Sequence, residues 1–376
     1  MHKTKLIAIY FPQFHNIPEN DEWWGKGFTD WQLVQDAKPL YKGHIQPRVP
    51  IDEDYYNPCN AETIAKQIKL AKSYGISGFM FYHYWFDGKL ILEKPLETFL
   101  NNQDLDMPFC LSWANPSWTR QWKGNNEVLL KQQHLADKDL WRKHFDYLLP
   151  FLKDKRAMKI DGKPMFVIYV PEIVNRVSEM FECWQTWAKE NGLPGIYFIA
   201  TKGYDFANPS FLASYDAMLK FQPREANTSA KNIKKSGVYK FGNIFRRLPK
   251  SWQDKLVEWR IKVKGITFHS TKNVWDIILK YAYENDYPQY DLQIFESAFF
   301  EWDNTARYAR RANIFTETTI EEKKEFFEEL YKKSLEAKVP YLFFNAWNEW
   351  SEAAYLEPDK HNGYSHLEII KNTISK

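Results

Sequence analysis

Short apolar runs alternate with amphipathic stretches along most of the chain. The apolar runs predict buried strands, and apolar residues spaced three and four apart predict the helices between them. The predicted strands cover residues 6–11, 76–85, 108–115, 165–170, 196–200, 217–221, 293–300 and 341–344. The predicted helices cover residues 60–74, 90–100, 138–152, 179–190, 320–337 and 367–373. This order of strand-then-helix units predicts an α/β protein with a (β/α)₈ barrel, the TIM barrel.

The end of the eighth predicted strand carries a dense group of polar residues. Glu349 and Glu352 follow this strand three residues apart, with tryptophans around them. On a helical turn the two carboxylates would share one face, and ionising both would cost Coulomb energy. Their pKa values would then differ, so that one carboxyl serves as an acid and the other as a base. The alternative is a helix start with solvated glutamates and core tryptophans.

Polar and aromatic residues also follow the first, second, third and seventh predicted strands. Active sites of (β/α)₈ barrels lie at the carboxyl ends of the strands, on the βα loops. A long first loop, residues 13–58, is rich in tryptophan and histidine, which is typical of a functional loop. The sequence therefore predicts one site at this end of the barrel.

Residues 224–291 interrupt the alternation between the sixth and seventh predicted strands. Residues 224–264 contain twelve Lys and Arg residues against three acidic residues, a net charge of +9. Aromatic residues are interleaved with these basic residues. One interpretation is therefore an amphipathic flap over the cleft, or a contact for acidic lipid or polymer. The other is a solvated pair of inserted helices. We expect a single catalytic domain, residues 1–376, with residues 224–291 as an insertion within it.

Composition limits the class of protein. The chain has 376 residues, of which 44% are apolar and 17% aromatic, and its net charge is +3. A mean hydropathy of −0.58 and the lack of a long apolar run argue against a membrane span. The aromatic excess, beside Asn, His and acidic residues, favours a carbohydrate-binding cleft, although core packing explains part of it. No stretch matches a nucleic-acid-binding module.

The cysteines and the N-terminus bear on location. Cys59, Cys110 and Cys183 are few, odd in number and not in a metal-binding spacing, which fits a reducing compartment. The apolar run before Pro12 is too short for the core of a signal peptide. We therefore expect a cytoplasmic protein.

Five stretches of the sequence resemble one known family. They are IAIYFPQFHNIPENDEWWGKGFTDW (7–31), GFMFYHYWFDGK (78–89), LSWANPSWTRQW (111–122), EWDNTARY (301–308) and AWNEWSEAAYLEPD (346–359). These stretches are similar to the WbsX family of bacterial polysaccharide-biosynthesis proteins, which is related to glycoside hydrolase family 99. The resemblance covers nearly the whole chain except the basic insertion. Ala306 stands where the family would have a proline, a departure expected to alter one turn and not the chemistry.

The resemblance implies a (β/α)₈ barrel that acts on glycans. The stretch that resembles the catalytic segment of family 99 makes Glu349 the base and Glu352 the general acid. In that family the base is thought to deprotonate the 2-hydroxyl of the sugar, which then attacks the anomeric carbon and gives a 1,2-anhydro sugar. Both carboxylates can then come from one turn, whereas the usual retaining pair flanks the bond about 5–5.5 Å apart.

Further residues at the predicted strand ends are expected to contact the substrate. They are Tyr10, His15, Trp23, Trp24, His83, Tyr84, Trp113, Asn115, Trp118, Trp122, Trp302, Asp303, Arg307, Trp347 and Asn348. Indole rings offer flat faces for sugar stacking, and the polar groups can bond sugar hydroxyls. Structural alternatives remain: some tryptophans belong to the core, and His83 is a buried structural histidine. Asp303 and Arg307 either form an ion pair in the cleft or only brace the loop.

No metal or other cofactor is expected. His15, His44 and Asp30 fit no common ligand spacing. The Asp-x-Asp string of metal-dependent glycosyltransferases occurs at residues 52–54 and 104–106, but the string is short and often arises by chance. The second copy precedes the third predicted strand, at the wrong end of a barrel for the site.

Three functions compete. The first is a retaining glycoside hydrolase or transglycosylase that acts on bacterial cell-surface polysaccharide or its precursors. The second is a glycosyltransferase of O-antigen, capsule or lipopolysaccharide biosynthesis, which the WbsX resemblance and the expected location favour. The third is a non-catalytic glycan-binding barrel, which the presence of both glutamates argues against. The expected partners are an oligo- or polysaccharide and, through residues 224–264, a lipid-linked glycan or an anionic membrane; no nucleic acid is expected.

Overall fold

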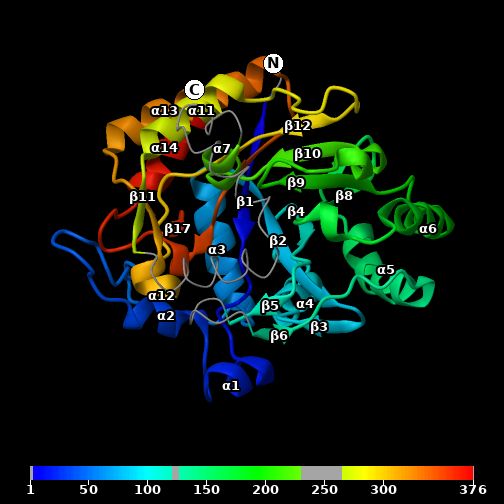
Figure 1. The fold of residues 1–376 in the computed structure, drawn as a ribbon, viewed down its shortest axis with the longest axis horizontal. Coiled ribbons are helices and arrows are strands. Elements are labelled where there is room, and N and C mark those ends of the chain that lie inside the picture. The colour runs from blue at the N-terminus through cyan, green and yellow to red at the C-terminus, as the bar shows by residue number, and fades with distance from the viewer. Residues whose placement is uncertain (1–2, 121–126, 230–264, 376) are drawn as a thin grey trace, which may run out of the picture.

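Parallel strands form a barrel at the centre of the structure (Figure 1). The computed structural model describes residues 3–120, 127–229 and 265–375. The barrel strands are β1 (Lys5–Tyr10), β2 (Ile76–Phe86), β4 (Phe109–Trp113), β8 (Lys163–Ile168), β9 (Tyr197–Lys202), β10 (Ala217–Lys220), β12 (Gln293–Phe295), β13 (Ser297–Ala298) and β15 (Tyr341–Phe344). Their order is β12-β10-β9-β8-β4-β2-β1-β15-β13, and each pair of neighbours is parallel.

The two ends of this sheet are consecutive segments of one stretch of chain. Only Glu296 separates β12, which pairs with β10, from β13, which pairs with β15. The backbone N–H of Phe343 donates to the carbonyl of Glu296 at 3.0 Å. The sheet therefore closes on itself, which confirms the predicted (β/α)₈ barrel. The seventh strand is interrupted where the sequence predicts one run over residues 293–300.

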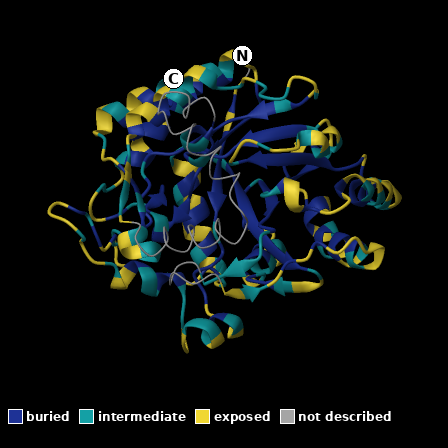
Figure 2. Ribbon diagram, in the orientation of Figure 1, coloured by how far each residue is buried: buried dark blue, intermediate teal, exposed yellow. Residues whose placement is uncertain are grey.

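Successive strand residues belong to two different hydrophobic clusters. Ile7 and Ile9 lie in the cluster that fills the barrel, whereas Leu6, Ala8 and Tyr10 lie in the cluster between the strands and the helices. The strands are dark blue in Figure 2, because both of their faces are buried. Such a sheet requires continuous apolar runs, which explains why the sequence predicts these strands well.

Helices surround the barrel. They are α3 (Ala61–Ser73), α4 (Lys94–Asn101), α5 (Lys138–Lys153), α6 (Val177–Glu190), α7 (Arg224–Thr228), α11 (Thr271–Tyr281), α13 (Ile320–Glu336) and α14 (Ser365–Ile374). In α3, Ile64, Ile68 and Ala71 are buried at helical spacing against the barrel. The outer faces of the helices carry most of the exposed residues in Figure 2.

Caps and turns explain the element boundaries. The side chain of Asn60 accepts a hydrogen bond from the backbone N–H of Glu62 and caps α3. Thr319 and Glu322 form a capping box at the start of α13. Gly75, with φ of +89°, turns the chain from α3 into β2, a conformation that favours glycine.

One predicted helix begins at the wrong residue. The sequence predicts a helix over residues 90–100, but α4 begins at Lys94. The preceding residues form β3 (Lys89–Ile91), which pairs antiparallel with the end of β2. The strand-forming residues Leu90 and Ile91 therefore extend a hairpin instead of a helix. A second small hairpin joins β7 (Lys159–Ile160) to β8.

Small elements surround the carboxyl ends of the barrel strands. They are α1 (Pro18–Trp24), α2 (Asp30–Asp36), α12 (Thr305–Tyr308), the pair β5 (Trp118–Thr119) and β6 (Val128–Leu130), and the pair β16 (Asn348–Glu349) and β17 (Ala354–Tyr355). In Figure 1, α1, α2, α12 and the β5–β6 pair lie at the lower end, opposite the two chain termini. The predicted long loop of residues 13–58 contains α1 and α2.

The described part of residues 224–291 carries regular structure. It contains α7, α11 and β11 (Thr267–His269), which pairs in parallel with β14 (Asn313–Phe315). Residues 230–264, which hold most of the predicted basic stretch and its proposed membrane contact, lie outside the described residues. Among the helices that the structure describes, none has the length and apolarity needed to cross a bilayer.

Candidate active site

One guanidinium joins three carboxylates at the carboxyl end of the barrel. The Nη2 atom of Arg307 on α12 lies 2.7 Å from Oδ2 of Asp30 and 3.2 Å from Oε1 of Glu349. Its Nη1 atom lies 3.1 Å from Oε1 of Glu352. All four side chains are mostly buried. Arg307 therefore holds together three acids whose negative charges would otherwise repel each other.

Contacts from two other loops fix the segment that carries the glutamates. Glu349 ends β16, and Glu352 ends the turn of 3₁₀ helix that follows. The side chain of Asn348 accepts from the backbone N–H of Phe11 at 2.8 Å and donates to its carbonyl at 3.0 Å. The backbone N–H of Asp303 donates to the carbonyl of Glu352 at 2.8 Å. The segment is thus tied to the loops after β1 and β13.

Asp30 comes from the first loop, as the first residue of α2. Thr29 and Gln32 form a capping box that fixes the start of this helix. Besides Arg307, the Oδ2 atom of Asp30 accepts hydrogen bonds from Gln13 at 3.0 Å. This side chain is 4% exposed, so these donors replace the hydrogen bonds that water would otherwise supply.

Glu349 is 1% exposed and has polar partners on several sides. Ser351 Oγ donates to its Oε1 at 2.7 Å and Gln13 Nε2 donates to its Oε2 at 3.2 Å. Burial raises the pKa of Glu349 to about 8; the Arg307 charge opposes this rise, and the neighbouring Glu352 carboxylate adds to it. A carboxyl of this kind exchanges a proton close to neutral pH, which suits acid–base catalysis.

A cavity of about 200 Å³ opens beside Glu349 and Glu352. The other residues that line it are Phe11, Tyr82, Tyr84, Ala114, Pro116, Trp118, Tyr169, Phe221, Arg224, Trp302, Arg307 and Asn345. Half of the lining residues are aromatic, and the carboxyl groups lie together in the wall. Such a cavity suits a ligand with one flat apolar face and several polar groups.

Six residues that the sequence predicts for the site line this cavity. They are Tyr84, Trp118, Trp302, Arg307, Glu349 and Glu352. Two further predicted residues hold loops next to the cavity. Asn348 ties β16 to β1, and Asp303 Oδ2 hydrogen-bonds to His44 at 2.7 Å and to Gln46 at 2.9 Å. Asp303 and Arg307 have separate partners in the structure. Asp303 braces a loop through His44 and Gln46, whereas Arg307 pairs with Asp30, Glu349 and Glu352.

Three predicted residues face the helices rather than the cavity. Tyr10 Oη donates to Gln67 on α3 at 2.8 Å. His83 Nε2 lies 2.9 Å from His144 Nε2 on α5, and Trp113 Nε1 donates to a backbone carbonyl of β2 at 3.0 Å. Neighbouring strand residues point to opposite faces, which explains why Tyr84 lines the cavity and His83 does not.

Two more predicted residues make structural contacts within the barrel. The side chain of Asn115 accepts from the backbone N–H of Val170 at 2.8 Å and donates to its carbonyl at 2.9 Å. Trp347 is fully buried, with its ring 5.4 Å from that of Phe79. Both residues stabilise the barrel around the site.

The remaining predicted residues come from loops. Trp23 packs edge to face on the cavity residue Trp118, with ring centroids 5.9 Å apart. Trp24 lies under a neighbouring guanidinium, 5.3 Å from its ring centroid. His15 is buried, and its Nδ1 lies 2.8 Å from a backbone carbonyl. Trp122 lies outside the described residues. Among these loop residues in the described part of the chain, Trp23 therefore extends the aromatic wall of the cavity through its contact with Trp118.

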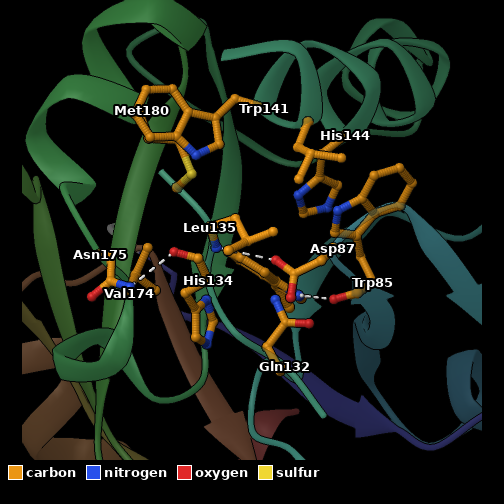
Figure 3. A pocket seen from close by; sticks show the side chains of 12 residues that line it. Trp85, Asp87, Gln132, His134, Leu135, Trp141, His144, Val174, Asn175 and Met180 are labelled. Atoms are coloured by element: carbon orange, nitrogen blue, oxygen red, sulfur yellow. Dashed lines mark hydrogen bonds between the residues drawn. The ribbon is translucent and has the colours of Figure 1, made fainter. Parts of the chain in front are cut away.

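A second, smaller hollow lies beside α5 (Figure 3). Its volume is about 20 Å³, and Trp141, His134 and His144 are among its lining residues. Asn175 Nδ2 donates to the carbonyl of His134 at 3.0 Å, and Asp87 accepts from backbone N–H groups of the same loop. This space suits about one water molecule and excludes a sugar. Within residues 3–120, 127–229 and 265–375, no group of three or more His, Cys, Asp or Glu side chains could hold a metal ion.

The sequence analysis misses several residues of the site. Tyr82 could have been found, because it lies two residues before Tyr84 in the same predicted strand and so shares its face. Gln13 and Asp30 gave no such signal, since Gln13 meets Glu349 across 336 residues of sequence. Arg224 was counted with the basic stretch, but its side chain lies in the cavity wall.

Two solved structures with a similar fold are a glycoside hydrolase and a glycoside hydrolase-like protein. A glycoside hydrolase-like protein aligns with a TM-score of 0.60 and 12% identity, over 100% of this chain and 94% of that chain. The family 99 endo-alpha-mannosidase of Bacteroides thetaiotaomicron aligns with a TM-score of 0.55 and 13% identity, over 98% of this chain and 96% of that chain. At these identities the likeness establishes the shared barrel fold.

Two related proteins come from strains of Xanthomonas campestris pv. campestris, and each is described as "Uncharacterized protein WxcX". Each is 29% identical to this chain over 376 residues. The alignment covers 99% of this chain and 50% of each relative. The chain therefore spans about half the length of these relatives.

A family profile covers almost the whole chain. The profile described as Glycosyltransferase WbsX matches residues 6–370. The matched residues include Asp30, Arg307 and both glutamates of the cavity, so they extend over the whole candidate site. The resemblance of the five sequence stretches is confirmed, and the chain belongs to the WbsX glycosyltransferase family.

Proposed function

We propose that this chain is a carbohydrate-active enzyme that cleaves or transfers glycosidic bonds with retention of configuration. The observation that carries the proposal is the pair of Glu349 and Glu352, joined by Arg307 beside a cavity with aromatic walls. Glycosidases need two carboxyl groups at the bond that breaks, and aromatic side chains bind the apolar faces of sugars. The substrate class is an oligo- or polysaccharide of the bacterial cell surface, or its precursor.

Glu349 is the base in this proposal. Ser351, Gln13 and Arg307 all direct donors at its carboxylate oxygens, and such donors favour the ionised form of a carboxyl. Burial opposes them and raises the pKa of Glu349 to about 8. The group is therefore a stronger base than an exposed carboxylate, and still ionises within the physiological range.

Glu352 is the acid, on the cavity side of the same turn. Glu349 takes the proton of the sugar 2-hydroxyl while that oxygen forms a bond to the anomeric carbon. The glycosidic bond breaks, and the leaving oxygen takes the proton of Glu352. In the second step Glu352 accepts a proton from water or from a sugar hydroxyl, which opens the 1,2-anhydro ring, and Glu349 returns its proton to the 2-oxygen. Two displacements at one carbon retain the configuration.

Transfer from a nucleotide-sugar is the second candidate function, because the matched family is described as a glycosyltransferase. The two Asp-x-Asp strings lend it no support. All four aspartates, at positions 52, 54, 104 and 106, are exposed and outside the cavity wall, and Asp106 pairs with Lys72. The same cavity would support transfer if a sugar hydroxyl takes the place of water in the second step.

The test compares wild type, Glu349→Gln and Glu352→Gln on α-linked oligosaccharides and on nucleotide-sugars with acceptors, with products followed by NMR. We expect release of a sugar with retained configuration in the wild type and loss of turnover in both variants. Glu182→Gln, exposed on α6, is the matched control and should behave as wild type.

The products separate the candidates. Turnover that requires a nucleotide-sugar makes the chain a transferase, and an inverted product excludes the anhydro-sugar route. Full activity in both glutamate variants would exclude Glu349 and Glu352 as the catalytic pair, and absence of turnover in the wild type would leave only glycan binding.

The proposed contact with a lipid-linked glycan or an anionic membrane concerns residues 224–264. It rests on the net charge of +9 in that stretch. Deletion of residues 230–264 should weaken binding to vesicles that contain anionic lipid, and unchanged binding would exclude the contact.

A further inference from the structure

The cavity contains a second guanidinium that differs from Arg307 in its surroundings. Arg224 is the first residue of α7, three residues after the cavity residue Phe221. It lines the cavity with Glu349 and Glu352. Arg307 pairs with three carboxylates. Within the described ranges, no carboxylate lies within ion-pair distance of Arg224.

Aromatic rings hold Arg224 in place. Its Cζ atom lies 5.8 Å from the ring centroid of Tyr169 and 5.6 Å from those of Tyr204 and Phe221. Its Nη1 atom donates to Tyr169 Oη at 2.6 Å. A guanidinium has five N–H donors, and among the described residues only this hydroxyl receives one. The remaining donors are available to a ligand in the cavity.

The neighbouring backbone leaves space for this side chain. Gly203 follows β9, and a Cβ atom built on it would lie 3.1 Å from Cδ of Arg224. The negative charge of Glu352 across the cavity helps to raise the pKa of Arg224, although the two side chains make no direct bond. Arg224 therefore stays protonated at any physiological pH. The cavity wall therefore presents a permanent positive charge on apolar rings, where an anion would gain more than in water.

We propose that Arg224 makes the cavity selective for sugars that carry an oxyanion, either the carboxylate of a uronic acid or the phosphate of an activated donor. The inference rests on the proposed function, since it names the class of sugar that binds beside Glu349 and Glu352. Arginine receives both groups through two parallel N–H bonds, a geometry that sugar hydroxyls do not match. The carboxylate and the phosphate share this chemistry, and the experiment distinguishes them.

Isothermal titration calorimetry with matched sugars tests the charge preference without turnover. Glucose, glucuronic acid and glucose 1-phosphate form one series, and the galactose and mannose counterparts form two more. We expect wild type to bind one anionic member of at least one series about 10- to 100-fold more tightly than the neutral sugar, the usual worth of a charge-assisted pair.

Variants assign the preference to one side chain. Arg224→Gln should bind the anionic and neutral sugars of that series equally. Arg224→Lys keeps the charge without the planar fork and should retain part of the preference. Arg142→Gln on α5, whose guanidinium pairs with Asp146 outside the cavity, is the matched control and should keep all of it. Unchanged melting temperatures show that each variant is folded.

Each outcome decides the proposal. A preference for uronic acids identifies an acidic polysaccharide, and a preference for sugar phosphates identifies an activated donor. Equal binding within every series, or a preference that survives Arg224→Gln, overturns the inference. Its failure is separate from that of the proposed function, because glutamate-dependent turnover of neutral glycans can persist when the charge preference is absent.

Discussion

Among the buried clusters of charged residues in the described part of the chain, two that lie against the barrel differ in what they face. The cavity cluster consists of Asp30, Arg307, Glu349 and Glu352. The outer cluster consists of Lys202, Lys220, Glu225, Asp286 and Glu296. In the outer cluster Lys202 Nζ lies 2.8 Å from Glu225 and 2.7 Å from Asp286, between the strands and the helix layer.

Each cluster contains a carboxyl whose pKa burial raises to about 8. Glu296, like Glu349, is 1% exposed, and its Oε1 accepts from Gln222 Nε2 and from the backbone of Ser297, both at 2.9 Å. Glu296 is not part of the cavity wall, whereas Glu349 is. A raised pKa, which burial mainly causes in both clusters, therefore does not by itself mark a catalytic residue. The cavity and its aromatic wall are what mark Glu349 as a candidate for catalysis.

The largest expected difference between the clusters is in turnover. Glu349→Gln should lower kcat/KM by about 10³-fold, because general acid–base groups contribute about 10²- to 10⁴-fold. Glu296→Gln, the same change in the outer cluster, should leave kcat/KM within about twofold of wild type. Steady-state kinetics on one glycan measure both. Equal losses in the two variants would mean that the cavity does not mark the site.

Replacement of the cations gives the next largest contrast. Arg307→Met leaves three acids without their cation, so the pKa of Glu349 should rise further and kcat/KM should fall by about 10²-fold at pH 7. Lys202→Met in the outer cluster should instead lower the free energy of unfolding by about 3 kcal/mol, because it leaves buried acids unpaired. Kinetics and urea denaturation of both variants measure these effects. A stability loss without a kinetic effect in Arg307→Met would assign that residue a structural role.

The pH dependence sharpens the roles within the cavity cluster. A base must be ionised, and burial raises the pKa of Glu349 to about 8. The value of kcat/KM should therefore rise about tenfold per pH unit below pH 8 and level off above it. If Glu349 is instead the acid, kcat/KM falls as pH passes 8, and the roles implied by the family resemblance are reversed. Glu296→Gln should leave the profile unchanged.

The sequence predicts the barrel well for a physical reason. Strands buried on both faces need continuous apolar runs, and these runs are visible without any tertiary information. The two cavity glutamates are also visible, because they end the last of these runs. The sequence does not show which face of a strand each side chain occupies. The sequence analysis selected His83 and Tyr84 together, although neighbours in a strand face opposite sides.

Long-range partners form the part of the site that the sequence did not reveal. Asp30 meets Arg307 across 277 residues of sequence, and Gln13 meets Glu349 across 336. Such contacts depend on how the loops meet after the barrel closes, and no local pattern encodes them. Arg224 shows the same limit, since its charge is obvious in the sequence while its place in the cavity wall is not.

The last expected effect concerns the free energy of unfolding and separates burial from catalysis. The pKa of Glu296 is about 8 in the folded protein and about 4.3 in an unfolded chain. Its contribution to stability is complete below pH 4.3 and is lost as pH rises to 8, because the unfolded state then releases a proton that the folded state retains. Glu296→Gln should therefore match wild type at pH 4 and exceed its free energy of unfolding by about 2 to 4 kcal/mol at pH 8.

Urea denaturation at the two pH values measures this difference, and Glu182→Gln on the exposed face of α6 should show no such dependence. A constant difference between Glu296→Gln and wild type would show that Glu296 titrates alike in the folded and unfolded chain. The comparison of the clusters would then change. Burial alone would no longer account for a raised pKa, and the cavity cluster would need a contribution from its own geometry, the three acids around one cation, to keep Glu349 protonated below pH 8.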